Sequence, residues 1–128
     1  MEKKNALAAL AALAQDTRLE VFRQLVQAGP EGLPAGRIAA LIGLPAATLS
    51  FHLNQLRQAD LITFRREGRS LIYIAEYPRM NALLAYLAEN CCAGTPPACV
   101  PLCAPAAGGE TALRMSAAEP GAPAGGPA

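Results

Sequence analysis

Four cysteines are the residues of this chain whose type and spacing most clearly suggest chemistry. They fall within one short stretch, as Cys91, Cys92, Cys99 and Cys103. A disulfide framework would spread its cysteines over the fold, so this cluster predicts a ligand or redox site instead. Thiolates favour soft ions. Adjacent side chains of a helix point about 100° apart, so Cys91 and Cys92 converge only where a helix frays, which Ala93 and Gly94 permit.

The same thiols leave other chemistries open. Four thiolates can hold zinc tetrahedrally, although an adjacent Cys-Cys pair fits the usual zinc spacing poorly. A thiol redox switch is another alternative, as is a metallochaperone-like thiol protein that uses the helical part as its scaffold. Cys91 alone would be explained by simple packing, because it falls on the apolar stripe of a predicted helix.

A second group of polar residues predicts contact with DNA. One predicted helix carries, between its apolar positions, Thr48, Ser50, His52, Asn54, Gln55 and Arg57. Hydroxyl, amide and guanidinium groups on an outer helix face can contact phosphates and base edges in a major groove. Arg65, Arg66 and Arg69 follow, and would lie over backbone phosphate or reach a minor groove. The alternative is an ordinary solvated helix face beside a charged hairpin tip.

Catalysis is not expected from these residues. His52 is the only histidine of the chain, and no nucleophile or carboxylate constellation accompanies it. DNA contact or helix packing explains His52 more simply. The sequence also indicates no obligatory cofactor.

The elements that position these residues follow from apolar spacing and turn residues. The predicted helices are Asn5–Ala14, Asp16–Ala28, Ala35–Ile42, Pro45–Ala59 and Pro78–Cys92, and the predicted strands are Leu61–Glu67 and Ser70–Ala75. Residues 31–34 are expected to form a connection, and Gly68 supplies a positive φ at the hairpin tip. A helix-turn-helix followed by a hairpin is a winged helix, so we predict a mainly α fold with a small β-hairpin.

Three details of these helices can be checked. Leu7, Leu10 and Leu13 form the apolar stripe of the first helix. Asp16 or Thr17 is expected to cap the second helix. In the third helix, Ile38, Leu41 and Ile42 are expected to face inward.

Composition divides the chain between residues 92 and 93. Two of every three residues in 93–128 are Ala, Gly or Pro and none is aromatic, so beyond the cysteines this tail is expected to be disordered. Residues 1–92 can hold one modest core and would gain stability by dimerising. The net charge of +1 does not by itself indicate nucleic acid.

The start of the chain does not resemble a secretory signal. Its Ala/Leu run is short, and the polar residues 15–18 follow it at once. No segment approaches the length of a membrane span. The chain is therefore expected to be cytoplasmic, with reduced thiols and no membrane partner.

Three stretches together resemble the ArsR–SmtB family of metal- and metalloid-sensing repressors. Residues 43–62 resemble its recognition-helix signature, residues 16–22 its opening motif, and Arg66–Arg69 with Tyr73 its wing. The resemblance covers roughly residues 5–92. It implies a homodimer on an inverted-repeat operator of double-stranded DNA, and we expect the first and last helices to form the dimer. The positions that it places against DNA are Thr48, Ser50, Phe51 and His52.

Two positions depart from the family pattern. Ala46 and Ala47 stand where the family often has Gln-Ser, so some of its polar contacts are missing here. Asp60 stands where the family often has Gly, which leaves the local turn in question.

Residues 89–95 resemble arsenic-responsive repressors in which vicinal cysteines close the last helix. In those proteins a third, downstream cysteine completes an arsenite site. The resemblance implies Cys91, Cys92 and Cys99 as ligands, with Cys103 as a spare or alternative third one. The expected function is a repressor that trivalent arsenic releases from its operator. Antimonite would bind to a similar set of thiolates.

Two alternatives remain within that class. One is a repressor selective for trivalent organoarsenicals, which need only Cys91 and Cys92. The other is a thiol redox or soft-metal sensor. Other sites of the family are absent, because residues 35–42 hold no cysteine and the last helix holds no histidine.

Overall fold

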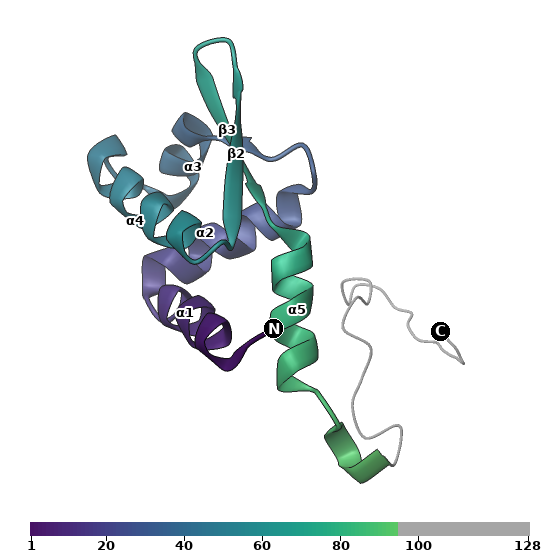
Figure 1. Cartoon of the computed structure of the whole chain (residues 1–128). Coiled ribbons are helices and arrows are strands. Elements are labelled where there is room, and N and C mark those ends of the chain that lie inside the picture. Colours follow the sequence, from purple (N-terminus) through teal and green to yellow (C-terminus); the bar gives the residue numbers. More distant parts are fainter. Residues whose placement is uncertain (95–128) are drawn as a thin grey trace, which may run out of the picture. The chain divides into compact units, whose positions relative to one another are not determined.

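The computed structural model describes residues 1–94 of the chain. It divides the chain into two units, Met1–Glu89 and Asn90–Ala128. The elements of the first unit are α1 (Lys3–Leu13), α2 (Asp16–Ala28), β1 (Leu33–Pro34), α3 (Ala35–Ile42), α4 (Ala46–Gln58), β2 (Ile62–Glu67), β3 (Ser70–Ala75) and α5 (Tyr77–Leu87) (Figure 1). This is the predicted order of a winged helix-turn-helix. The described part of the second unit contains one short 3₁₀ helix, η1 (Cys91–Gly94).

The core lies where α2, α3 and α4 meet the base of the sheet. Leu25, Ile38, Leu49, Leu56 and Leu61 are completely or almost completely buried there. Each such side chain contributes about 1.5–3 kcal/mol through burial. Because Leu49, Leu53 and Leu56 all lie on one side of α4, the opposite side of that helix is left for other contacts.

The sheet has three strands rather than the predicted two. Its order is β1-β3-β2, and both pairings are antiparallel. Residues 31–34 are therefore not only a connection, because Leu33 and Pro34 pair with Tyr73 and Ile72. Gly32 permits this close approach: a side chain there would collide with the Tyr73 carbonyl oxygen, and its φ is +73°.

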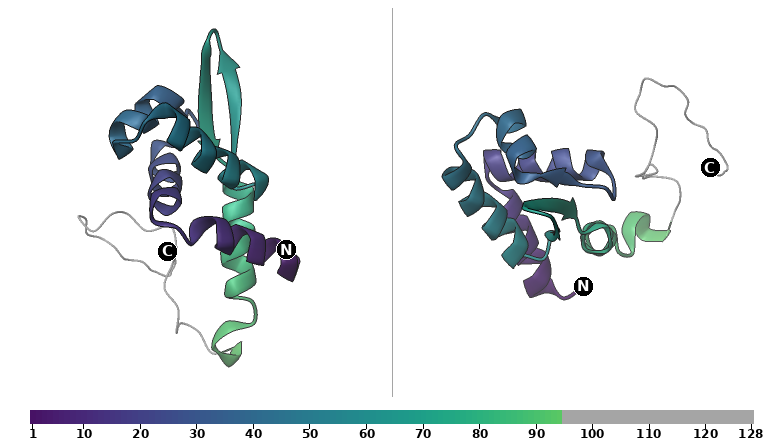
Figure 2. Two further views of the ribbon diagram at one scale, coloured as in Figure 1. Left: turned by 90° about the vertical axis from the view of Figure 1, so that its left-hand side faces the viewer. Right: turned by 90° about the horizontal axis from the view of Figure 1, so that it is seen from above.

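Strands β2 and β3 form the hairpin that projects away from the helices (Figure 2). Glu67 pairs with Ser70, so Gly68 and Arg69 form a two-residue loop. Gly68 has a φ of +61°, as a type II′ turn requires at its first central residue. The predicted role of Gly68 at the tip is therefore confirmed.

Helix α1 buries its alanines rather than its leucines. Ala6, Ala9 and Ala12 pack into the core, whereas Leu7 and Leu10 are 57% and 39% exposed. Small side chains let α1 approach its neighbouring helices closely, which leucines would prevent. Leu7 and Leu10 of the leucine stripe thus face outward, whereas Leu13 is half-buried against the core.

Two further details differ from the predictions. Helix α2 is capped by Gln15, whose side-chain oxygen accepts a hydrogen bond from the Arg18 N–H at 2.8 Å, and not by Asp16 or Thr17. In α3, Ile38 is buried but Leu41 is 47% exposed, because the short helix turns only one narrow side to the core.

Helix α5 ends at Leu87, four residues before the first cysteine. The prediction that the last helix reaches Cys92, with Cys91 on its apolar stripe, is therefore wrong. Asn90 has a φ of +57°, a left-handed conformation that Asn tolerates and that no α-helix can continue through. Asn90 therefore keeps a helix from reaching Cys91 and Cys92, although α5 itself ends three residues earlier.

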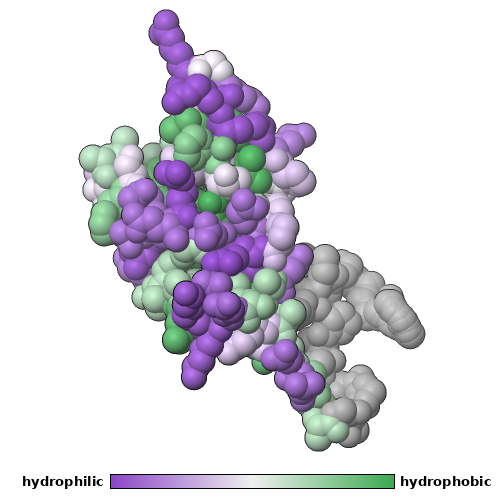
Figure 3. Space-filling model, viewed as in Figure 1, coloured by the Kyte–Doolittle hydropathy of each residue, from purple (hydrophilic) through white to green (hydrophobic). Residues whose placement is uncertain are grey.

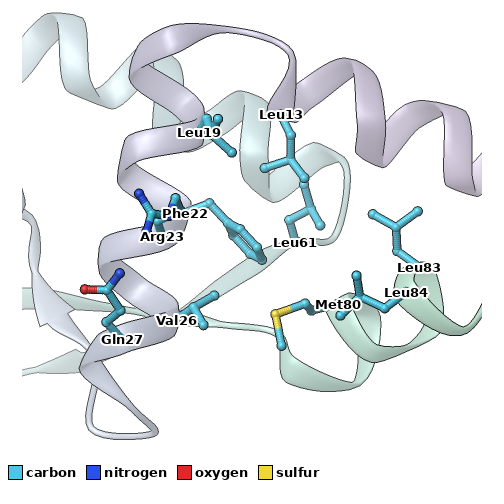
Figure 4. A pocket seen from close by; sticks show the side chains of 10 residues that line it. All are labelled: Leu13, Leu19, Phe22, Arg23, Val26, Gln27, Leu61, Met80, Leu83 and Leu84. Atoms are coloured by element: carbon cyan, nitrogen blue, oxygen red, sulfur yellow. The ribbon is translucent and has the colours of Figure 1, made fainter. Parts of the chain in front are cut away.

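An apolar cavity of about 280 Å³ lies between α1, α2 and α5. Figure 4 shows Phe22, Leu61 and Met80 pointing into it, while Gln27 points away.

No single helix within residues 1–94 is long and apolar enough to cross a membrane. Helices α3 and α4 meet that test only when taken together, and they are bent by 108° relative to each other.

Candidate nucleic-acid interface and thiol site

Helix α4 presents most of the predicted DNA-binding residues on the side away from the core. Thr48, Ser50, Phe51, Asn54 and Arg57 are exposed, and Gln55 is half-buried. This exposure follows from helix geometry, because Leu49, Leu53 and Leu56 hold the other side against the core. The outer face therefore offers hydroxyl, amide, guanidinium and aromatic groups to a partner.

His52 lies at the border between these two sides of α4. Its side chain is half-buried, and Nδ1 is fully buried without a hydrogen-bond partner among the described residues. Its ring meets the Phe51 ring edge to face, with centroids 5.4 Å apart and planes at 68°. His52 is thus less available to a partner than the other predicted residues, and it supports Phe51.

Arg57 connects the end of α4 to the sheet. Its guanidinium lies 4.6 Å from the centre of the Phe64 ring on β2, a cation–π contact. Phe64 in turn packs against Tyr73 on β3, with ring centroids 5.7 Å apart. Phe64 was not predicted from the sequence as a support for Arg57, although an aromatic residue early in the strand after a basic helix end is a signal for such a contact.

The arginines of the hairpin differ in how they are held. Arg65 donates from Nε to Glu67 Oε2 at 2.7 Å and from its terminal nitrogen to the Glu31 carbonyl at 3.0 Å. Arg66 and Arg69 are exposed. Figure 3 shows hydrophilic side chains gathered over the projecting hairpin. The structure thus holds Arg65 by two acceptors, which Arg65 would have to leave in order to contact a phosphate.

The described thiols lie in an unusual stretch of backbone. Cys91 is exposed and Cys92 is half-buried. Cys92 and Ala93 have φ values of +63° and +49°, so neither continues a right-handed helix. Adjacent thiols outside an α-helix are not held about 100° apart by helix geometry, which suits a shared thiophilic ligand.

The rest of the predicted ligand set lies outside the described residues, namely Cys99 and Cys103. Within residues 1–94, no group of three or more His, Cys, Asp or Glu side chains could hold a metal ion. The thiols of Cys91 and Cys92 supply two donors of the kind that soft ions prefer.

Helix α5 precedes these thiols in the chain, and a hydrogen bond attaches the first residue of α5 to α2. The Tyr77 hydroxyl donates to the Val26 carbonyl at 3.0 Å. This bond joins the start of α5 to the end of α2, the helix that packs against both α3 and α4. A movement of α5 can therefore shift α2, and with it the helices α3 and α4 that pack against α2.

Comparisons with known proteins agree with this arrangement. A helix-turn-helix domain family matches residues 13–64. The HTH-type transcriptional regulator YgaV of Escherichia coli is 30% identical over 89 residues, which are 70% of this chain and 88% of that protein.

Two solved structures share the fold. An ArsR-like transcriptional regulator from Rhodococcus sp. RHA1 superposes with a TM-score of 0.58 at 25% identity, over 66% of this chain and 76% of that one. The homodimeric winged helix-turn-helix domain of Mb0332 from Mycobacterium bovis superposes with a TM-score of 0.54 at 27% identity, over 68% and 81% of the two chains. With its helix-turn-helix, projecting hairpin and outward-facing α4, this chain belongs to the ArsR family of winged-helix, DNA-binding transcriptional regulators.

Proposed function

We propose that the chain is a homodimeric repressor that leaves an inverted-repeat operator when trivalent arsenic binds Cys91, Cys92 and Cys99. The observation that carries the proposal is that Cys91 and Cys92 lie four and five residues after the end of α5, where Cys92 has a left-handed backbone conformation. The third thiolate would come from Cys99, with Cys103 as the alternative. Such a regulator would work in the cytoplasm, where DNA and reduced thiols are found.

Release would follow from a coupling between two binding equilibria. Arsenic that prefers a rearranged α5 shifts the population toward that arrangement. Since Tyr77 joins α5 to α2, the rearrangement would change the position of the two α4 helices in the dimer. Operator affinity then falls by the same factor by which DNA weakens arsenic binding.

The proposed dimer is formed by α1 and α5. Leu7 and Leu10 on α1 and Leu87 on α5 are exposed, and the two helices contact each other within the chain. Exposed leucines on neighbouring helices are expected to be covered by a partner surface of the same kind. The homodimeric state of Mb0332 supports a dimer as such.

A two-thiolate site is the second candidate. It is favoured by the fact that the described thiols are an adjacent pair. Such a pair would suffice for a trivalent organoarsenical, or for a redox switch that converts two thiols to a disulfide.

The test is release of operator DNA by the full-length protein, titrated separately with arsenite, methylarsenite, antimonite, cadmium, zinc and an oxidant. Arsenite acting at the lowest concentration supports the three-thiolate site. Methylarsenite acting well below arsenite supports the two-thiolate site, and release by oxidant alone supports the redox switch. Retention of DNA under all of these conditions would contradict the proposed sensing.

A further inference from the structure

The outer side of α4 carries an apolar strip that a solvated helix would not need. Phe51 is 58% exposed, and Ala47 is exposed one turn before it. Residues four apart share one helix face. We call Ala47 and Phe51 the apolar strip of α4.

The strip cannot be part of the core of this chain. Phe51 is two positions from both Leu49 and Leu53, and two residues of a helix turn the chain by about 200°. The Phe51 ring meets the His52 ring edge to face, and His52 is half-buried. Phe51 is therefore supported from behind while its outer part meets solvent.

The surroundings of the strip are polar, which indicates the kind of partner. Thr48, Ser50 and Asn54 flank it, and all three are exposed. A protein interface can also surround an apolar centre with polar groups, but α4 is the second helix of a helix-turn-helix, the helix that such motifs place in the major groove of DNA. In a major groove those polar groups find phosphates and base edges, and the groove offers one apolar group, the C5-methyl of thymine.

We propose that Ala47 and Phe51 bind thymine methyl groups, so that each operator half-site carries thymines beneath the first turns of α4. This inference rests on the proposed operator binding by α4. The N-terminal part of a recognition helix is the part that meets base edges, and the strip lies there. The two alanines at the start of α4 leave room for a methyl group where longer side chains would fill the groove.

The experiment begins with selection of a preferred site from a random duplex pool by the full-length protein. Each thymine of that site is then replaced by deoxyuridine, which removes only the methyl group. We expect a loss of affinity of about fourfold for each methyl group that the strip covers. Phe51→Ala should lose a similar factor on the thymine site and become indifferent to the uracil substitution beneath residue 51.

Ser50→Ala is the matched control on the same helix. It should weaken binding to the thymine and uracil sites equally and so keep the difference between them. Thermal unfolding should be unchanged in both variants, because both side chains are exposed.

Three results would overturn the inference. One is a selected site without thymine in the half-site. Another is a wild-type affinity that uracil substitution leaves unchanged. The third is a Phe51→Ala variant that still discriminates thymine from uracil at every position. Failure of any duplex to be selected would instead contradict operator binding itself, and the inference with it.

Discussion

Asp60 holds a backbone conformation that most side chains disfavour, at the junction between α4 and β2. Its φ is +61°, and the residue lets the chain reverse so that the Leu61 N–H reaches the Leu56 carbonyl at 3.1 Å. Asp is among the few residues other than Gly that adopt this conformation readily. The departure from the family's usual Gly therefore keeps the turn, and Asp60 adds an ion pair with Arg79 at 3.5 Å.

Asp60→Gly and Asp60→Ala should separate the effect of the backbone conformation on stability from the effect of the Asp60 carboxylate. Both variants lose the ion pair with Arg79, so that loss cancels between them. Only Ala keeps the steric penalty of the left-handed conformation, and we expect the Gly variant to be more stable by about 1 kcal/mol. Chemical unfolding of both variants measures the difference. Equal stabilities would mean that the turn relaxes when the side chain changes.

At the scale of elements, the two parts of the proposed DNA surface are joined before any DNA is present. Arg57 of α4 lies over Phe64 of β2, and Arg65 of β2 bonds to the Glu31 carbonyl before β1. The hairpin is thus attached at its base to both neighbouring segments. Its tip, with Arg66 and Arg69, extends beyond these contacts.

Arg69→Ala should therefore weaken operator binding more than Arg65→Ala does. An arginine that contacts phosphate releases counterions, so its loss lowers the slope of log K against log salt by about one for each contact. Arg65 is already bound to Glu67 and Glu31, and we expect a smaller change in slope from its removal. Equilibrium binding over a range of salt concentrations measures both slopes. Equal slopes for wild type and Arg69→Ala would place the wing tip away from the DNA.

Most helices and strands of the fold could be predicted from the sequence. The predictions that were wrong have identifiable physical reasons. The order of helices and the hairpin follow from apolar spacing and from turn residues such as Gly68. The strand at Leu33–Pro34 is too short for periodicity, and it exists only because Tyr73 and Ile72 lie opposite. Which face of α1 is buried depends on how closely the neighbouring helices approach, and spacing alone favours the leucines.

At the candidate site, the exposure of most α4 residues could be predicted from the sequence, whereas the surroundings of His52 and the end of α5 could not. Exposure on α4 follows from helical phase, so most of the predicted residues lie outward. The burial of His52 Nδ1 depends on packing around the helix. The end of α5 was misplaced because Ala88 and Glu89 are good helix formers, so helix propensity favours a longer helix than the one that ends at Leu87.

At the scale of the whole molecule, the proposed function needs two copies of the chain. An inverted-repeat operator presents two half-sites, and a two-fold dimer matches that symmetry. The exposed leucines of α1 and α5 lie on different elements from the α4 face and from the hairpin tip. One chain can thus devote separate surfaces to its partner copy and to DNA.

Leu87→Glu should give monomers that no longer bind a full operator tightly. Leu87 is 59% exposed at the end of α5, so the charge costs little in the monomer and a great deal in an apolar interface. Leu41→Glu is the control, because Leu41 is 47% exposed on α3, outside the proposed interface. Light scattering and operator binding report the result. A Leu87→Glu dimer with full operator affinity would contradict the interface.

The final prediction concerns which thiols transmit the arsenic signal. Three thiolates bind arsenic more tightly than two, because each thiolate already bound raises the effective concentration of the next, a gain of about a hundredfold or more. Cys91 and Cys92 lie four and five residues after the end of α5, and Cys99 is separated from Cys92 by six residues that include Gly94. The loop back from Cys103 is longer, but closing it costs well under about 1 kcal/mol more, so the preference for Cys99 is small.

Single Cys→Ser variants should therefore all retain operator binding, since no cysteine lies on α4 or on the hairpin. Variants at residues 91, 92 and 99 should stay on the operator at arsenite concentrations about a hundredfold above those that release the wild type. The variant at residue 103 should still be released normally. Release measured by fluorescence anisotropy separates these cases. A normal response from Cys99→Ser together with none from Cys103→Ser would make Cys103 the third ligand. Dependence on residues 91 and 92 alone would favour the two-thiolate site, because only an adjacent pair would then be needed.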